Sequence, residues 1–120
     1  MYVTLFGGEI LRNKKGPNIG TFFTKQLNFK SMLHIPNLKH VGGELNVMGN
    51  QEVNESHFPS LETIKCDLII AKSGFRKLPP KLNHIGGRVI ISKSDPQSLV
   101  NDLIQASENG MIQGGIYFCD

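Results

Sequence analysis

The sequence contains no tryptophan, only two cysteines and no long apolar run. Cys66 and Cys119 form neither a CxxC pair nor a zinc-ligand spacing, so we expect two reduced thiols in an intracellular protein. No apolar stretch approaches the ~20 residues of a membrane span. The first ten residues lack the basic start and apolar core of a secretory signal. These absences predict a soluble, cytoplasmic protein without membrane attachment.

Charge is also sparse. Only 19% of the 120 residues are charged, and the net charge is +3. The densest basic run, residues 12–15, is much shorter than the polybasic blocks of nucleic-acid-binding tails. A chain of this length fits one domain with a modest hydrophobic core. We therefore treat residues 1–120 as a single domain.

Three segments of the sequence repeat one pattern without a gap. Residues 35–50 read IPNLKHVGGELNVMGN, residues 58–73 read FPSLETIKCDLIIAKS, and residues 79–94 read PPKLNHIGGRVIISKS. The shared pattern is P-x-L-x-x-[VI]-x-x-x-[LV]-x-[VI]-x-x-[NS], and the copies follow one another at nearly equal spacing. Self-similarity at a nearly fixed period is typical of repeat architectures.

This pattern resembles the leucine-rich repeat family, whose motif is L-x-x-L-x-L-x-x-[N/C] within roughly 20 to 29 residues. Leu38, Val41, Leu45, Val47 and Asn50 form this chain's version of the motif. The chain departs from the family pattern because the step from Val41 to Leu45 is longer than the motif's step. The resemblance covers residues 35–94. It implies an α/β, mostly β fold: a short, irregular leucine-rich-repeat-like solenoid with a parallel sheet.

The columns of the repeat have a physical interpretation. The run L-x-[VI] alternates as a half-buried strand does, so Leu45 and Val47 and their counterparts should point inward. The prolines lack a backbone donor and fit the return side of each repeat. The Gly-Gly pairs at residues 42–43 and 86–87 precede strands and not helices. We therefore interpret them as bends and not as phosphate-binding loops.

The flanks predict caps for the repeats. Residues 1–34 should form an N-terminal cap and a degenerate repeat, with Leu27 and Phe29 in the places of Leu45 and Val47. Residues 95–120 should form a C-terminal capping helix and a last strand. The expected helix covers about residues 96–108, with Asp95 as its N-cap, and the strand covers residues 114–119.

Residues between the inward columns should form outward rows across neighbouring strands, and Ile69 should stand beside Ile90. An apolar row on a sheet face indicates either a partner-binding patch or a face covered by the N-terminal segment or the helix. The sequence leaves both alternatives open. Ala71 also belongs to an outward row, and the residues that we assign to partner binding are Glu44, Asn46, Met48, Asp67, Ile69, Arg88, Ile90 and Ser92.

Catalytic and metal sites are not expected. Glu44 and Asp67 should stand one repeat apart, but Arg88 is placed to neutralise them. His40 and His84 occupy the same column two repeats apart, at ~10 Å, which is too far to share a metal ion. We expect no cofactor, no metal and no enzymatic activity.

The sequence therefore favours a non-enzymatic protein-protein binding module. We expect it to inhibit or modulate a host or cellular protein by occupying its surface, and a small phage or mobile-element protein would suit the size and composition. The alternative is a nucleic-acid or ribonucleoprotein binder that uses a basic N-terminal surface. Its residues would be Arg12, Lys14, Lys15 and Lys30. Neither the partner nor the oligomeric state follows from the sequence.

Overall fold

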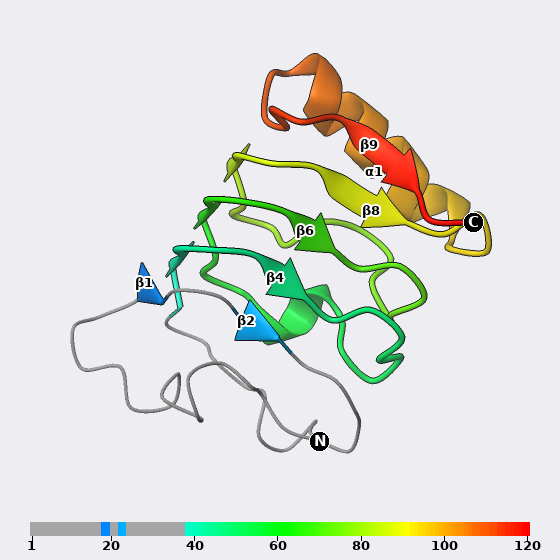
Figure 1. Cartoon of the computed structure of the whole chain (residues 1–120), viewed down its shortest axis with the longest axis horizontal. Coiled ribbons are helices and arrows are strands. Elements are labelled where there is room, and N and C mark those ends of the chain that lie inside the picture. The colour runs from blue at the N-terminus through cyan, green and yellow to red at the C-terminus, as the bar shows by residue number, and fades with distance from the viewer. Residues whose placement is uncertain (1–17, 20–21, 24–37) are drawn as a thin grey trace.

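The computed structural model describes residues 18–19, 22–23 and 38–120. Over these residues the chain forms short β-strands, a 3₁₀ helix η2 and one α-helix (Figure 1). In chain order the elements are β1 (Asn18–Ile19), β2 (Phe22–Phe23), β3 (His40–Val41), β4 (Leu45–Asn46), η2 (Glu55–His57), β5 (Thr63–Ile64), β6 (Leu68–Ile69), β7 (His84–Ile85), β8 (Val89–Ile91), α1 (Gln97–Glu108) and β9 (Ile116–Phe118).

The strands form two parallel sheets, in the orders β1-β3-β5-β7 and β2-β4-β6-β8-β9. Successive repeats pair column by column, so Leu45 lies opposite Leu68 and Leu68 lies opposite Val89. Each repeat contributes one short strand to each sheet, and we call these two strands together a rung. The α/β class, the parallel pairing and the C-terminal helix are confirmed.

The second sheet differs from the single parallel sheet expected from the sequence. Val41, Ile64 and Ile85 pair with one another as strands, whereas we expected them only to fill the core. The backbone is extended on both sides of each corner, and stacking in register pairs both extended pieces. The described elements do not show the finer expectation, a leucine-rich-repeat solenoid.

The core lies between the two sheets and the return segments. Leu45, Leu68 and Val89 have no exposed surface, and the next inward column, Val47, Ile70 and Ile91, is equally buried. Phe58 and Phe75 stack on the return side with ring centroids 6.1 Å apart. Burial of these columns supplies the main stabilisation, at about 25 cal/mol per Å² of apolar surface.

The N-terminal rung lies earlier in the chain than expected. Phe22, not Leu27, pairs with Leu45, and the spacing from Phe22 to Leu45 equals the spacing from Leu45 to Leu68. The sequence step from Ile19 to Phe22 is one residue shorter than the step from Val41 to Leu45. The N-terminal copy therefore does not fit the repeat pattern without a gap, and the sequence pattern did not reveal it. Leu27, Phe29 and the proposed cap lie outside the described residues.

A further rung follows α1. Ile112 forms a bridge with Ile85, and β9 pairs with β8 so that Ile116 lies opposite Val89. The segment I-x-x-x-I-x-F at residues 112–118 thus repeats the columns of residues 85–91. The spacing to this rung is longer than the spacing between the earlier rungs because α1 occupies its return side. The expected last strand is confirmed, and the structure shows that it is also a repeat.

The helix α1 runs from Gln97 to Glu108, close to the expected range, and buries Leu99, Leu103 and Ala106. Its N-cap is Pro96, which makes no side-chain capping bond, so the expected capping role of Asp95 is wrong. The Asp95 carboxylate instead accepts hydrogen bonds from the backbone N–H groups of Lys72 and Ser92. Gly110 ends the helix with φ +80°, a conformation that glycine adopts easily.

The glycines at the corners allow close backbone stacking. Neither Gly86 nor Gly87 has a positive φ. A Cβ atom on Gly86 would collide with the backbone carbonyl oxygen of Lys65 in the preceding rung. A Cβ atom on Gly114 would lie 2.6 Å from the carbonyl of Gly87. Adjacent corners therefore approach too closely for a side chain on the facing side.

Within the described part of the chain, no helix has the length and apolar character needed to cross a bilayer.

Gly86→Ala should lower the free energy of unfolding by about 1–3 kcal/mol because the added methyl group must push the corner away from Lys65. Urea denaturation measures this change. Lys65→Ala is the matched control: it alters the same corner column at an exposed position and should change stability by less than about 0.5 kcal/mol. Equal midpoints for Gly86→Ala and the wild type would contradict the proposed packing.

Candidate partner-binding surface

The outer face of the β2-β4-β6-β8-β9 sheet carries one continuous row of side chains. The register places Asn46 opposite Ile69, Ile69 opposite Ile90, and Ile90 opposite Tyr117. Ile69 and Ile90 are half-buried, and Tyr117 is 50% exposed. The sheet thus brings together residues from four separate parts of the sequence. We call Asn46, Ile69, Ile90 and Tyr117 the outer row.

The outer row does not face α1. Its neighbours along the strands, including Leu68, Ile70 and Val89, belong to the same core cluster as the helix residues Leu99 and Leu103. Because side chains alternate along a strand, the outer row points to the opposite side of the sheet. Coverage of Ile69 and Ile90 by the helix, one of the two alternatives left open by the sequence, is therefore wrong. The N-terminal segment named in that alternative lies outside the described residues.

A charged pair flanks the outer row. Arg88 Nη2 lies 3.0 Å from Asp67 Oδ2, and the Arg88 backbone N–H donates to Asp67 Oδ1 at 2.8 Å. The Arg88 guanidinium also lies over the ring of Tyr117, with its central carbon 5.7 Å from the ring centroid. The cation is therefore positioned by a carboxylate on one neighbouring rung and by an aromatic ring on the other.

This geometry favours the ionised forms of both charged groups. The backbone N–H of Arg88 is the largest cause that lowers the pKa of Asp67, and the Arg88 guanidinium adds to the effect. The hydrogen bond to Asp67 in turn raises the pKa of Arg88. Arg88 is thus the cationic partner of Asp67 that the sequence indicated.

The residues expected to form a third outward row, Met48, Ala71 and Ser92, do not all point outward. Met48 is 43% exposed, whereas Ala71 and Ser92 have no exposed surface. The chain turns directly after the inward columns, with Ser73 N–H donating to the Ile70 carbonyl and Asp95 N–H donating to the Ser92 carbonyl. Ala71 is therefore a turn residue, Ser92 directly precedes a turn, and neither lies in a strand. The assignment of Ser92 to the partner-binding surface is wrong.

Tyr117 is the surface residue that the sequence analysis missed. It joins the outer row because residues 112–118 form an additional rung. The signal was present in the spacing of Ile112, Ile116 and Phe118. The helix α1, inserted between this rung and the preceding one, lengthened the period and concealed the repeat.

Other acidic side chains link successive rungs. Each accepts a hydrogen bond from a backbone N–H that is distant in the sequence. Asp120, for example, accepts from Lys93 N–H at 2.9 Å and bonds the buried Ser92 hydroxyl, which lowers the pKa of Asp120. These carboxylates have structural partners. The acceptor and donor pairs are Glu55 with Arg76, Asp67 with Arg88, Asp95 with Lys72, Asp102 with Leu78, and Asp120 with Lys93.

The histidines and cysteines that the structure describes do not gather into a site. His40 Nδ1 lies 2.7 Å from Thr63 Oγ1, and the register puts Thr63 between His40 and His84. Cys66 and Cys119 are both exposed, and their thiols form no disulfide. Among the described residues, no group of three or more potential ligands is positioned to hold a metal ion.

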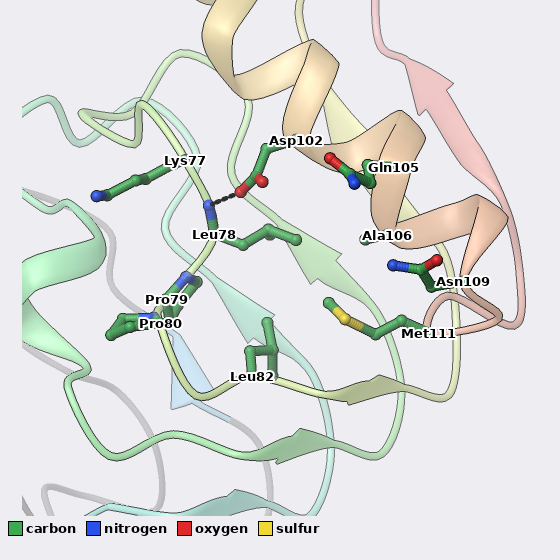
Figure 2. Close-up of a pocket in the computed structure, with 10 residues that line it drawn as sticks. All are labelled: Lys77, Leu78, Pro79, Pro80, Leu82, Asp102, Gln105, Ala106, Asn109 and Met111. Atoms are coloured by element: carbon green, nitrogen blue, oxygen red, sulfur yellow. Dashed lines mark hydrogen bonds between the residues drawn. The ribbon is translucent and has the colours of Figure 1, made fainter.

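A groove of about 350 Å³ separates residues 77–82 from α1 (Figure 2). Leu78, Leu82 and Met111 converge in it from its two sides, and the Leu78 N–H donates to Asp102 at 2.8 Å. Lys77 and Asp102 are the titratable side chains in its lining. Because Asp102 on α1 accepts from the backbone of Leu78, a structural hydrogen bond bridges the groove. The groove is a packing seam between the helix and the preceding rung.

The alternative basic surface consists of Arg12, Lys14, Lys15 and Lys30, which all lie outside the described residues. Comparisons with protein-family models, with curated proteins and with solved structures found no match.

The pKa of Asp67 should lie below its usual value of about 3.9 in the folded protein. Ionised Asp67 therefore stabilises the fold at neutral pH, by less than about 1 kcal/mol for so exposed a pair, and this contribution is lost as the pH falls through the lowered pKa. An NMR titration of the Asp67 carboxyl carbon measures the shift.

In the same titration, Arg88→Ala should raise the pKa of Asp67 only part of the way to its usual value. The substitution removes the guanidinium but retains the backbone N–H, which is the larger cause. Complete recovery of the usual value would show that the side chain alone is responsible.

Proposed function

We propose that the outer face of the β2-β4-β6-β8-β9 sheet binds another protein. In this proposal the chain is a non-enzymatic module that inhibits or modulates its partner by occupying the partner's surface. The observation that carries the proposal is the outer row, where Ile69, Ile90 and Tyr117 stand side by side on the side of the sheet away from the core. Apolar side chains gathered on one face commonly mark an interaction site.

The chemistry of the face favours a protein partner. Ile69, Ile90 and Tyr117 supply an apolar centre, with Met48 at its margin and the Asp67–Arg88 pair beside it. Tyrosine, arginine and methionine are enriched in protein interfaces, which combine an apolar core with a polar rim. A small-molecule site would require a concave pocket. The groove beside α1 lies on a different part of the molecule from the outer row.

The acidic residues support binding over catalysis. General acid-base chemistry at neutral pH requires a group whose pKa lies near that pH. Asp67, the carboxylate beside the outer row, has its pKa shifted in the opposite direction by Arg88. Asp95, Asp102 and Asp120 are engaged by backbone N–H groups.

The family relationship is part of the same proposal. The repeat columns of residues 35–94 support descent from short leucine-rich-repeat-like proteins, which present broad, preformed surfaces. A phage or mobile-element origin, with a host factor as the partner, fits a binding module of this small size.

Ile69→Asp combined with Ile90→Asp should abolish partner capture, because two charges would be buried at the centre of the interface. The tagged full chain is incubated with an extract of its native cells, and captured proteins are identified by mass spectrometry. The matched control is Lys81→Asp combined with Asn83→Asp, two exposed positions away from the outer row, which should retain the same partner. Circular dichroism checks that both variants are folded.

Equal capture by the double isoleucine variant and the wild type would overturn the proposal. Unfolding of that variant would show that the face is core, in which case Tyr117→Ala, at a 50% exposed position, serves as the milder test. Capture of nucleic acid that weakens steeply with salt and with Lys14→Ala and Lys15→Ala would support the alternative function.

A further inference from the structure

In the described part of the chain, the rung formed by residues 112–118 has a neighbouring rung on one side only. Phe118 occupies the same column as Val47, Ile70 and Ile91, which have no exposed surface. Phe118 is nevertheless 47% exposed. The difference follows from its position, because β9 is the end strand of the sheet and no described strand lies beyond it (Figure 1).

The backbone of β9 is also incomplete on that side. The Gly115 carbonyl and the Cys119 N–H bond to β8, so by alternation Ile116 and Phe118 direct their N–H and C=O groups to the free edge. These groups have no hydrogen-bond partner among the described residues. Exposed edges are usually protected by the shortness of the strand, by a bulge, or by charged residues and proline. β9 is short, with 3 residues. Its sequence Ile-Tyr-Phe provides neither a charged residue nor proline.

The helix extends the apolar character of this end. Asp102 faces the preceding rung, where it binds the Leu78 N–H. Residue 104 lies about 200° around the helix from Asp102, so Ile104 faces the open end. Val100, one turn earlier, and Ile116 pack against the core cluster and border this end. Val100 is half-buried and Ile104 is 47% exposed. We call Val100, Ile104, Ile116 and Phe118 the end face.

Charge does not oppose the approach of an identical surface. Residues 109–119, which lead into β9 and form it, contain no charged side chain. The carboxylate of the next residue, Asp120, is bonded to the Ser92 hydroxyl and the Lys93 N–H of the preceding rung. Within α1, the charged residues are Asp102, which is bonded to the preceding rung, and Glu108 in the last turn. Two end faces can therefore meet without like-charge repulsion at their centre.

We propose that the end face binds a second molecule of this protein, through antiparallel pairing of β9 with β9 of that molecule. Pairing centred on Tyr117 sets Phe118 opposite Ile116 of the second molecule and satisfies the free N–H and C=O groups of both residues. An unrelated extended peptide would gain few hydrogen bonds from so short a strand. A second molecule also contributes its own Phe118 and Ile104 to the contact. We therefore favour a second copy of this chain over an unrelated peptide.

Sedimentation equilibrium of the full chain over a range of concentrations tests this proposal. The expected result is a reversible monomer-dimer equilibrium with a limiting mass of twice 13.3 kDa. Phe118→Lys should weaken dimerisation by at least about tenfold, because it places a charge in the contact. Phe118→Pro should do the same by removing one outward N–H, and it retains the bonds to β8, since those come from the neighbouring residues. Circular dichroism checks that both variants are folded. If Phe118→Lys unfolds, the dimerisation constant of Phe118→Pro tests the proposal instead.

The antiparallel register has its own test. Tyr117→Cys, in a chain with Cys66→Ser and Cys119→Ser, should form an intermolecular disulfide on mild oxidation, because the two positions 117 face each other at a non-hydrogen-bonded pair. Gln113→Cys in the same background is the control and should not cross-link efficiently.

The dimer and the proposed partner surface can fail separately. Ile69→Asp with Ile90→Asp should leave the dimer intact, and Phe118→Pro should leave partner capture intact. A monomer at every concentration, or a mass that grows without limit, would overturn the symmetric pairing. A dimer that withstands both Phe118 variants would overturn the assignment to the end face.

Discussion

The structure depends on the in-register parallel pairing of successive repeats. Leu45, Leu68 and Val89 are opposite one another, so each rung buries the apolar side chains of the next. A slip by one residue would turn every inward side chain outward. The close stacking of corners, which leaves no room for a Cβ on Gly86 or Gly114, follows from the same register. A repeat unit of this kind has little stability alone and obtains it from its neighbours.

The same constraint forms both proposed surfaces. Alternation along each strand places an outward residue beside every inward one, and the register aligns those residues into the outer row. The described stack also has an end at β9. Phe118 lies there in the same column as the buried residue Ile91, but its side chain is exposed. The outer row and the end face point in different directions. One molecule could therefore bind a partner on its sheet and a second molecule at its end.

Carboxylates contribute to this architecture by linking neighbouring rungs. Asp67, Asp95, Asp102 and Asp120 each accept from a backbone N–H of a neighbouring rung. Such charge-assisted bonds satisfy donors at corners and turns where the ladder stops. Asp67, which the sequence analysis weighed as one half of a carboxylate pair, thus has a structural partner in the neighbouring rung.

The sequence by itself determined the local pattern. The alternation in L-x-[VI], the proline column and the helical spacing of Leu99 and Leu103 depend on neighbouring residues. They predicted the strands that carry Leu45, Leu68 and Val89, the register of those strands, and α1, but they did not predict the second sheet. The tertiary structure decided those strand pairings and burials that depend on residues far apart in the sequence. Phe22 replaced Leu27 as the partner of Leu45 because a short corner shifts the phase, and Ser92 became buried because the chain turns to meet Asp95 and Asp120. Tyr117 joined the outer row because α1 is accommodated on the return side of a rung, and only the three-dimensional stack shows that the same columns continue after the helix.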